Sequence, residues 1–205
     1  LPPDLPHAIR RFHRQIAGFR MSPLKALPSL AASLGLGGIW VKDESSRIDL
    51  DSFKVLGGSY AIYQLIRKRL GVEDQEIPFA HLTQAAVRDR LGAITFATAT
   101  DGNHGRGVAW IASQLGYRAV IYVHQLTSPE RIRSLVQSGA EVVVVQGNYD
   151  DAVRQVVKDA RQNGWEVVSD TAWEGYEEVP KWVMQGYMTM LSETQEQLAG
   201  QGLSG

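Results

Sequence analysis

A lysine at the start of a predicted helix is the first residue that could do chemistry. Lys54 lies in the segment DSFKVLGG at 51–58, between a polar loop and a helical pattern. A helix N-terminus carries partial positive charge, which disfavours a lysine cation and favours the neutral, nucleophilic amine. The two following glycines each cost about 1 kcal/mol relative to alanine, so a ligand or a packed neighbour is expected to approach the backbone there. A surface lysine without a chemical role is the alternative.

A glycine-rich turn between a predicted strand and a predicted helix is the second candidate site. It reads TATDGNHGRG at 98–107. Free backbone N–H groups at a helix N-terminus bind carboxylate or phosphate, and glycines let the ligand come close. The turn has no GK[ST] of a Walker A loop, and its glycine order differs from the dinucleotide fingerprint. We predict an anion site here, with Asp101 as a helix cap, a catalytic group or both.

A second aspartate lies at the end of another predicted strand. Asp170 follows the strand expected at 166–169, so Asp101 and Asp170 both lie just past the carboxyl ends of strands. Open α/β sheets bind ligands at this edge, where two carboxylates could bind a cationic substrate group. A turn-forming aspartate is the alternative. The five histidines lack metal-ligand spacing, and the chain has no cysteine and no G-x-S-x-G motif, which disfavours metal, thiolate and serine-hydrolase chemistry.

The elements that must position these residues follow from periodicity. Short apolar strands are expected at 94–97, 120–123, 142–145 and 166–169. Three intervening helices are expected: one at about 105–115, one that opens at 128–129 and closes at Gly139, and one with an apolar stripe from Val153 to Ala160 that ends near Gly164. Strands that alternate with crossover helices predict a parallel sheet and an α/β fold. Outside this region the pattern predicts a strand at 39–42, a helix from Lys54 to about Leu70, a short helix at 85–91 and a last helix around 182–191.

Composition limits the kind of partner. The chain has 205 residues and a formal net charge of −1, with both signs of charge scattered along it. This distribution provides no field that would gather nucleic acid or an anionic membrane, and no apolar run approaches the roughly 20 residues of a membrane helix. The absence of cysteine fits a cytoplasmic protein. We therefore expect a small-molecule partner.

The candidate motifs resemble those of fold-type II pyridoxal-phosphate enzymes, the group that includes tryptophan synthase β, threonine dehydratase and cysteine synthase. The segment SFK at 52–54, followed by VLGG, resembles their Schiff-base lysine segment, and TDGNHG at 100–105 resembles their asparagine loop. Aspartate at position 101, together with DTAWEGY at 170–176, is similar to the diaminopropionate ammonia-lyases within that group. The resemblance extends from Ser22 to Tyr187.

The resemblance implies a tryptophan synthase β-like α/β fold, a parallel sheet with flanking helices, and pyridoxal 5′-phosphate as cofactor. Lys54 would bind the cofactor covalently, Phe53 would lie beside its ring and Asn103 would hydrogen-bond its 3′-oxygen. The backbone from Thr100 to His104 would hold the substrate carboxylate, and Asp170 would pair with a substrate ammonium. The implied substrate-binding residues are Thr100, Asp101, Gly102, His104 and Asp170.

The implied reaction is α,β-elimination from 2,3-diaminopropionate. The Cα proton leaves, the β-amino group departs as ammonia, and hydrolysis of the product gives pyruvate and a second ammonia. Lys54 would be the base on one face of the substrate and Asp101 on the other, so that both enantiomers react. The alternatives are a serine or threonine dehydratase of the same group and a non-catalytic fragment. The resemblance also suggests a homodimer.

The expected domain organisation is that of a truncated enzyme. Residues 1–76 would form the N-terminal part of a large domain with Lys54, residues 77–170 a small α/β domain with the asparagine loop, and residues 171–205 the start of the return into the large domain. No glycine loop for the cofactor phosphate and no partner for the pyridine nitrogen are found in the sequence. We therefore expect an N-terminal half that alone is inactive and binds the cofactor weakly, with an exposed, mobile apolar stripe at Leu56, Tyr63 and Ile66.

Overall fold

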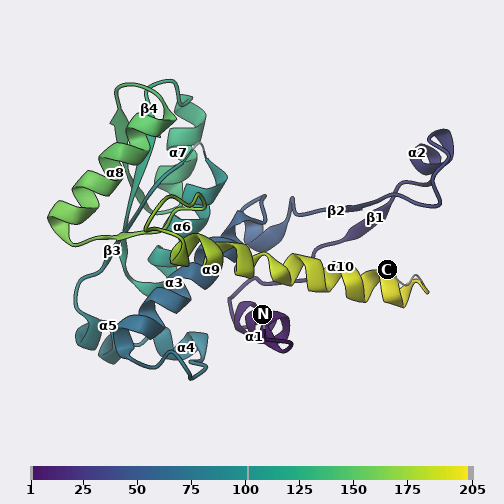
Figure 1. Ribbon diagram of the computed structural model, residues 1–205, viewed down its shortest axis with the longest axis horizontal. Helices are drawn as coiled ribbons and strands as arrows, with labels where there is room; N and C mark the ends of the chain where they lie inside the picture. Colours follow the sequence, from purple (N-terminus) through teal and green to yellow (C-terminus); the bar gives the residue numbers. More distant parts are fainter. Residues whose placement is uncertain (1, 101, 203–205) are drawn as a thin grey trace.

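A four-stranded parallel sheet forms the centre of the α/β part of the chain. The computed structural model describes residues 2–100 and 102–202 (Figure 1). The strand order is β5-β4-β3-β6, with all three neighbouring pairs parallel. The strands are β3 (Thr95–Ala99), β4 (Arg118–His124), β5 (Ala140–Val145) and β6 (Glu166–Val167). The predicted α/β fold with a parallel sheet is confirmed.

Three crossover helices connect these strands, as the sequence predicts: α6 (Asn103–Leu115), α7 (Pro129–Gln137) and α8 (Tyr149–Asn163). The predicted start of α7 is confirmed, because the Ser128 side chain accepts from the Arg131 N–H and Pro129 occupies the first turn. Successive strand side chains point to opposite faces of the sheet. Accordingly, Ala97 and Tyr122 pack with α8 in one apolar cluster, whereas neighbouring strand residues join the larger cluster with α6 and α7.

Helix α3 (Lys54–Leu70) lies at the centre of the larger cluster, where it contacts α1 (Leu5–His13), α6 and α9 (Glu178–Gly186). The predicted exposure of its apolar stripe is wrong. Leu56 and Ile66 are 0% exposed and Tyr63 is 4% exposed. The reason is that α1 and α9 cover this face of α3. The predicted exposure did not take these two helices into account.

Glycines permit the close packing around α3. A Cβ built at Gly57 would lie 2.5 Å from the Tyr187 ring, and one built at Gly58 would lie 3.3 Å from Val108 Cγ2. On the facing helix, a Cβ at Gly186 would lie 2.3 Å from the Leu56 carbonyl oxygen. The close approach that the sequence predicts at Gly57 and Gly58 is therefore made by the packed helices α9 and α6.

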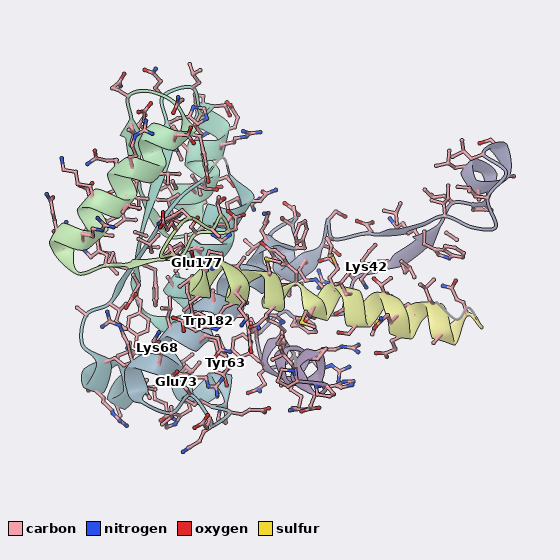
Figure 2. The ribbon with its side chains drawn as sticks, in the orientation of Figure 1. Lys42, Tyr63, Lys68, Glu73, Glu177 and Trp182 are labelled. Atoms are coloured by element: carbon pink, nitrogen blue, oxygen red, sulfur yellow. The ribbon has the colours of Figure 1, made fainter. Side chains whose placement is uncertain are left out.

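An arm extends from the body of the molecule beside α10 (Met188–Gly200) (Figure 1). It consists of the antiparallel strands β1 (Leu24–Ala26) and β2 (Trp40–Lys42), with α2 (Pro28–Ser33) at its tip. Figure 2 shows Lys42 close to α10, where its amine contacts Glu193 at 3.0 Å. Glu193 also binds Arg47 of the short 3₁₀ helix η1 (Arg47–Asp49) at 2.6 Å, and both side chains are 0% exposed. This buried charge network ties the arm to α10.

The remaining elements are short. The helix predicted at 85–91 is α5 (Ala85–Leu91), preceded by α4 (Phe79–Leu82), which the sequence did not predict. The single last helix predicted around 182–191 is two helices, α9 and α10, which meet at Tyr187. Among the helices of the described ranges, none has both the length and the apolar character needed to cross a bilayer.

Candidate active site

Lys54 and Asp170 meet at the start of α3. The Lys54 Nζ donates a hydrogen bond to Asp170 Oδ2 at 2.6 Å, and the two side chains are 31% and 20% exposed. The structure thus brings together two residues that the sequence proposes separately, one at a helix N-terminus and one after a strand. The third, Asp101, lies outside the described residues, between the end of β3 and Gly102.

His104 lies on the other side of the Asp170 carboxylate. Its ring is 4% exposed; Nε2 hydrogen-bonds the Val168 carbonyl at 2.7 Å, and Nδ1 lies 3.9 Å from Asp170 Oδ2. Burial lowers the pKa of His104, so its ring is neutral near pH 7. Burial alone would raise the pKa of Asp170, but His104 and the Lys54 hydrogen bond outweigh it and lower that pKa. Asp170 is therefore ionised, with Lys54 as the cation that faces it.

The asparagine loop leads from β3 into α6. Thr100 is buried, and its hydroxyl oxygen accepts from the backbone N–H groups of Gly102 at 3.0 Å and Gly105 at 3.2 Å. A Cβ at Gly102 would meet no atom within 4 Å, so the space above the loop is open. Asn103 begins α6 with an exposed side chain. The Thr100 hydroxyl thus shapes the turn, and the helix N-terminus beside it has the polarity that binds an anion.

Two aromatic rings border the Lys54 amine. The rings of Phe53 and Tyr187 meet edge to face at 5.0 Å, and Lys54 Nζ lies 5.7 Å from the centroid of each. Phe53 belongs to the predicted site, but Tyr187 does not. In the sequence Tyr187 lies at the end of the resemblance, and its helical spacing is typical of a core residue.

The segment that leads into Lys54 has an unusual backbone. Ile48, Asp49 and Asp51 have φ values of 50°, 55° and 54°, in the left-handed region that non-glycine residues rarely adopt. Arg47, held by Glu44 and Glu193, anchors the beginning of this segment. Such a conformation persists only where the surroundings enforce it, and such positions cluster at functional sites. The buried network therefore helps to fix where the Lys54 helix begins.

The residues present fit a pyridoxal-phosphate site. A primary amine, partly exposed, projects between aromatic rings that could contact a planar cofactor, and an amide side chain is exposed at the adjacent helix start. Two buried polar atoms near the Lys54–Asp170 pair, His104 Nδ1 and the Tyr187 hydroxyl, have no hydrogen-bond partner in the described part of the chain. Across residues 2–100 and 102–202, no three His, Asp or Glu side chains are grouped so that they could hold a metal ion.

Comparison with known proteins identifies the family. The family described as pyridoxal-phosphate dependent enzyme matches residues 17–202, a range that contains every residue of the site. The chain belongs to this family. The names of its relatives describe several activities. It is 49% identical to the diaminopropionate ammonia-lyase of Escherichia coli K12 over 195 residues, and 28% identical to a probable D-serine dehydratase of Acidovorax over 142 residues.

A solved structure supports the same family assignment. The E. coli diaminopropionate ammonia-lyase in apo form has a TM-score of 0.91 and 48% identity, covering 98% of this chain and 54% of that chain. The E. coli enzyme has also been solved in complex with D-serine and in complex with an aminoacrylate-PLP azomethine reaction intermediate. The chain spans about half the length of the curated relatives it matches, 48% of the E. coli K12 enzyme.

Proposed function

We propose that the protein eliminates ammonia from 2,3-diaminopropionate with pyridoxal phosphate, giving pyruvate and ammonia. The observation that carries the proposal is the 2.6 Å contact between Lys54 and Asp170, beside the asparagine loop. An ionised carboxylate at this position supports a substrate with a second ammonium group, which the carboxylate could bind. The 49% identity to a diaminopropionate ammonia-lyase over 95% of this chain supports the same substrate.

Each residue of the site has a role in this proposal. Lys54 holds the cofactor and takes the Cα proton on its own face of the substrate, and Asp101 takes it on the other face. The backbone N–H groups at the start of α6 bind the substrate carboxylate, while Asn103 and Phe53 contact the cofactor. Asp170 binds the ammonium at the β-carbon. The cofactor, when bound, supplies the electron sink that makes loss of the Cα proton possible.

The domain boundaries and the assembly are further parts of the proposal. We infer that residues 1–76 and 171–205 belong to one domain, because α3 packs on α9 while α1 packs on α10. Residues 77–170 hold the complete parallel sheet, which supports a separate small domain. The proposed homodimer and cytoplasmic location rest on the resemblance to fold-type II enzymes, and sedimentation and cell fractionation would test them.

A serine or threonine dehydratase is the competing function. The 28% identity to a probable D-serine dehydratase is the observation that favours it. A non-catalytic protein is the other alternative. The deciding experiment measures pyruvate formation by the intact, cofactor-loaded protein with diaminopropionate and with serine. We expect kcat/KM to be at least about tenfold higher for diaminopropionate, since serine has no second ammonium group for the Asp170 carboxylate to bind.

The controls separate chemistry from folding. Lys54→Arg should abolish pyruvate formation, whereas Lys158→Arg at an exposed position of α8 should leave it unchanged. Two ammonia molecules should appear for each pyruvate from diaminopropionate. A preference for serine would assign the dehydratase function, and no pyruvate from either substrate would contradict both.

A further inference from the structure

Tyr187 lies against the candidate site without a place in the proposed reaction. Its ring centroid is 5.7 Å from Lys54 Nζ, and its edge-to-face contact with Phe53 makes the two rings adjacent walls around the amine. Aromatic ring faces carry negative potential and attract cations. Together with the Asp170 carboxylate, these rings form a small cation-binding site, in which the Lys54 ammonium lies.

The hydroxyl of Tyr187 is available to form hydrogen bonds. The oxygen is buried and has no hydrogen-bond partner among the described residues. A buried hydroxyl without a partner is destabilising, so such a group calls for a partner in the working protein. Burial and the negative charge of Asp170 raise the pKa of Tyr187, so the group stays a neutral hydroxyl that can both donate and accept.

The fold holds the Tyr187 ring in this place by means of two glycines. A Cβ at Gly57 would lie 2.5 Å from the ring, so any side chain at that position of α3 would displace it. Gly186, the residue before Tyr187, lets α9 approach so closely that a Cβ there would lie 2.8 Å from the Gly57 Cα. The Tyr187 ring therefore packs against the backbone of α3, the helix that begins with Lys54.

We propose that Tyr187 is a specificity-determining residue: its hydroxyl and ring face, together with Asp170, bind the second ammonium group of the substrate. The inference rests on the proposed function, which names diaminopropionate as that substrate. The hydroxyl accepts from the ammonium, the ring face attracts its charge, and the carboxylate balances it. A substrate with a neutral β-hydroxyl, such as serine, gains neither the charge attraction nor the ion pair.

The test measures substrate binding without turnover. Borohydride reduction fixes the cofactor to the intact protein and stops the reaction, and calorimetry then gives the dissociation constants of diaminopropionate and serine. Tyr187→Phe keeps the ring and removes the hydroxyl. We expect it to weaken diaminopropionate binding about tenfold, as for loss of a hydrogen bond to a charged group, and to change serine binding by less than about twofold.

Tyr117→Phe is the matched control. The Tyr117 hydroxyl is also buried without a partner among the described residues, and its ring also lies edge to face on a phenylalanine, Phe96, but in a different part of the fold. This variant should change neither dissociation constant. The proposal is overturned if Tyr187→Phe weakens both ligands equally or leaves diaminopropionate binding unchanged. Failure of the proposed function shows separately, as absence of pyruvate from diaminopropionate with the unreduced wild-type protein.

Discussion

At the scale of single residues, the Lys54–Asp170 pair sets the charge balance of the site. Lys54 and His104 are the described side chains in ionic range of the Asp170 carboxylate, and the buried His104 is neutral near pH 7. In the proposed reaction Lys54 would be bonded to the cofactor, which would leave the Asp170 carboxylate to bind a substrate ammonium. When the substrate amine replaces Lys54 on the cofactor, Lys54 would leave as a neutral amine that can accept the Cα proton, so substrate binding and base activation are coupled.

Asp101 provides a prediction about stereochemistry. If Asp101 is the base opposite Lys54, Asp101→Asn should lower kcat/KM for D-diaminopropionate by about 10²- to 10⁴-fold, because Lys54 still serves the L enantiomer. Pyruvate release from each enantiomer gives the answer, with Asp89→Asn at an exposed position of α5 as the control. Equal losses for both enantiomers would show that Asp101 binds substrate or caps α6 instead.

The sequence singles out candidate residues where a motif or the end of an element marks them, and their roles stay predictions. Residue type and position mark Lys54 and Asp170, whereas Asn103 follows from the resemblance alone. Tyr187 does not stand out, because an aromatic residue at helical spacing is indistinguishable from a core residue until its ring is found beside the Lys54 amine and its hydroxyl is found buried without a partner among the described residues. The 2.6 Å contact between Lys54 and Asp170 cannot be predicted from the sequence either, since it depends on where the start of α3 lies relative to the segment after β6.

At the scale of elements, the contact between α3 and α9 positions the lysine. Gly186→Ala would push a Cβ to 2.3 Å from the Leu56 carbonyl oxygen, and backbone cannot move aside cheaply. We expect the free energy of unfolding to fall by about 1–3 kcal/mol, the range for overpacking a core. Urea denaturation of the cofactor-free intact protein measures this loss.

Gly200→Ala is the control for that substitution. Gly200 is also helical, but a Cβ there would meet no atom within 4 Å, so alanine should leave stability unchanged or raise it by up to about 1 kcal/mol. If the Gly186→Ala and Gly200→Ala variants had the same stability, α3 and α9 would have room to separate, and their contact at the glycines would not be rigid.

Periodic elements were predicted and irregular ones were not. The strands and crossover helices of the parallel sheet follow from alternating apolar runs and clear caps, as at Ser128. By contrast, α4 has four residues and β1 has three, which is too short for periodicity to show. The division of the last helix at Tyr187 is marked by no proline in the sequence, and Tyr187 itself keeps helical φ and ψ values of −69° and −13°.

At the scale of the whole molecule, a buried histidine makes stability depend on pH. His13 of α1 is 0% exposed; its ring binds the Thr189 hydroxyl at 2.7 Å and the Leu56 carbonyl at 3.0 Å, and so joins α1 to α10 and α3. Burial lowers the pKa of His13 to about 3. The unfolded chain takes up this proton near pH 6.5, so stability should fall as the pH drops from 6.5 toward 3.

The size of the effect can be measured by urea denaturation at two pH values. Between pH 7 and pH 5, His13 should lower the free energy of unfolding by about 2 kcal/mol, and the buried His104 acts in the same direction. His13→Gln should reduce this pH dependence, whereas His7→Gln, at an exposed position of the same helix, should keep it. An unchanged pH dependence in His13→Gln would show that His13 takes up its proton as readily in the folded protein as in the unfolded chain.

Borohydride reduction identifies the amine that holds the cofactor, which we propose is Lys54. The intact protein, loaded with pyridoxal phosphate, is reduced, digested and mapped by mass spectrometry. We expect one labelled peptide, which contains Lys54, and no label in Lys54→Arg. Stoichiometric label on another lysine, such as Lys42 at the base of the arm, would show that Lys54 does not hold the cofactor.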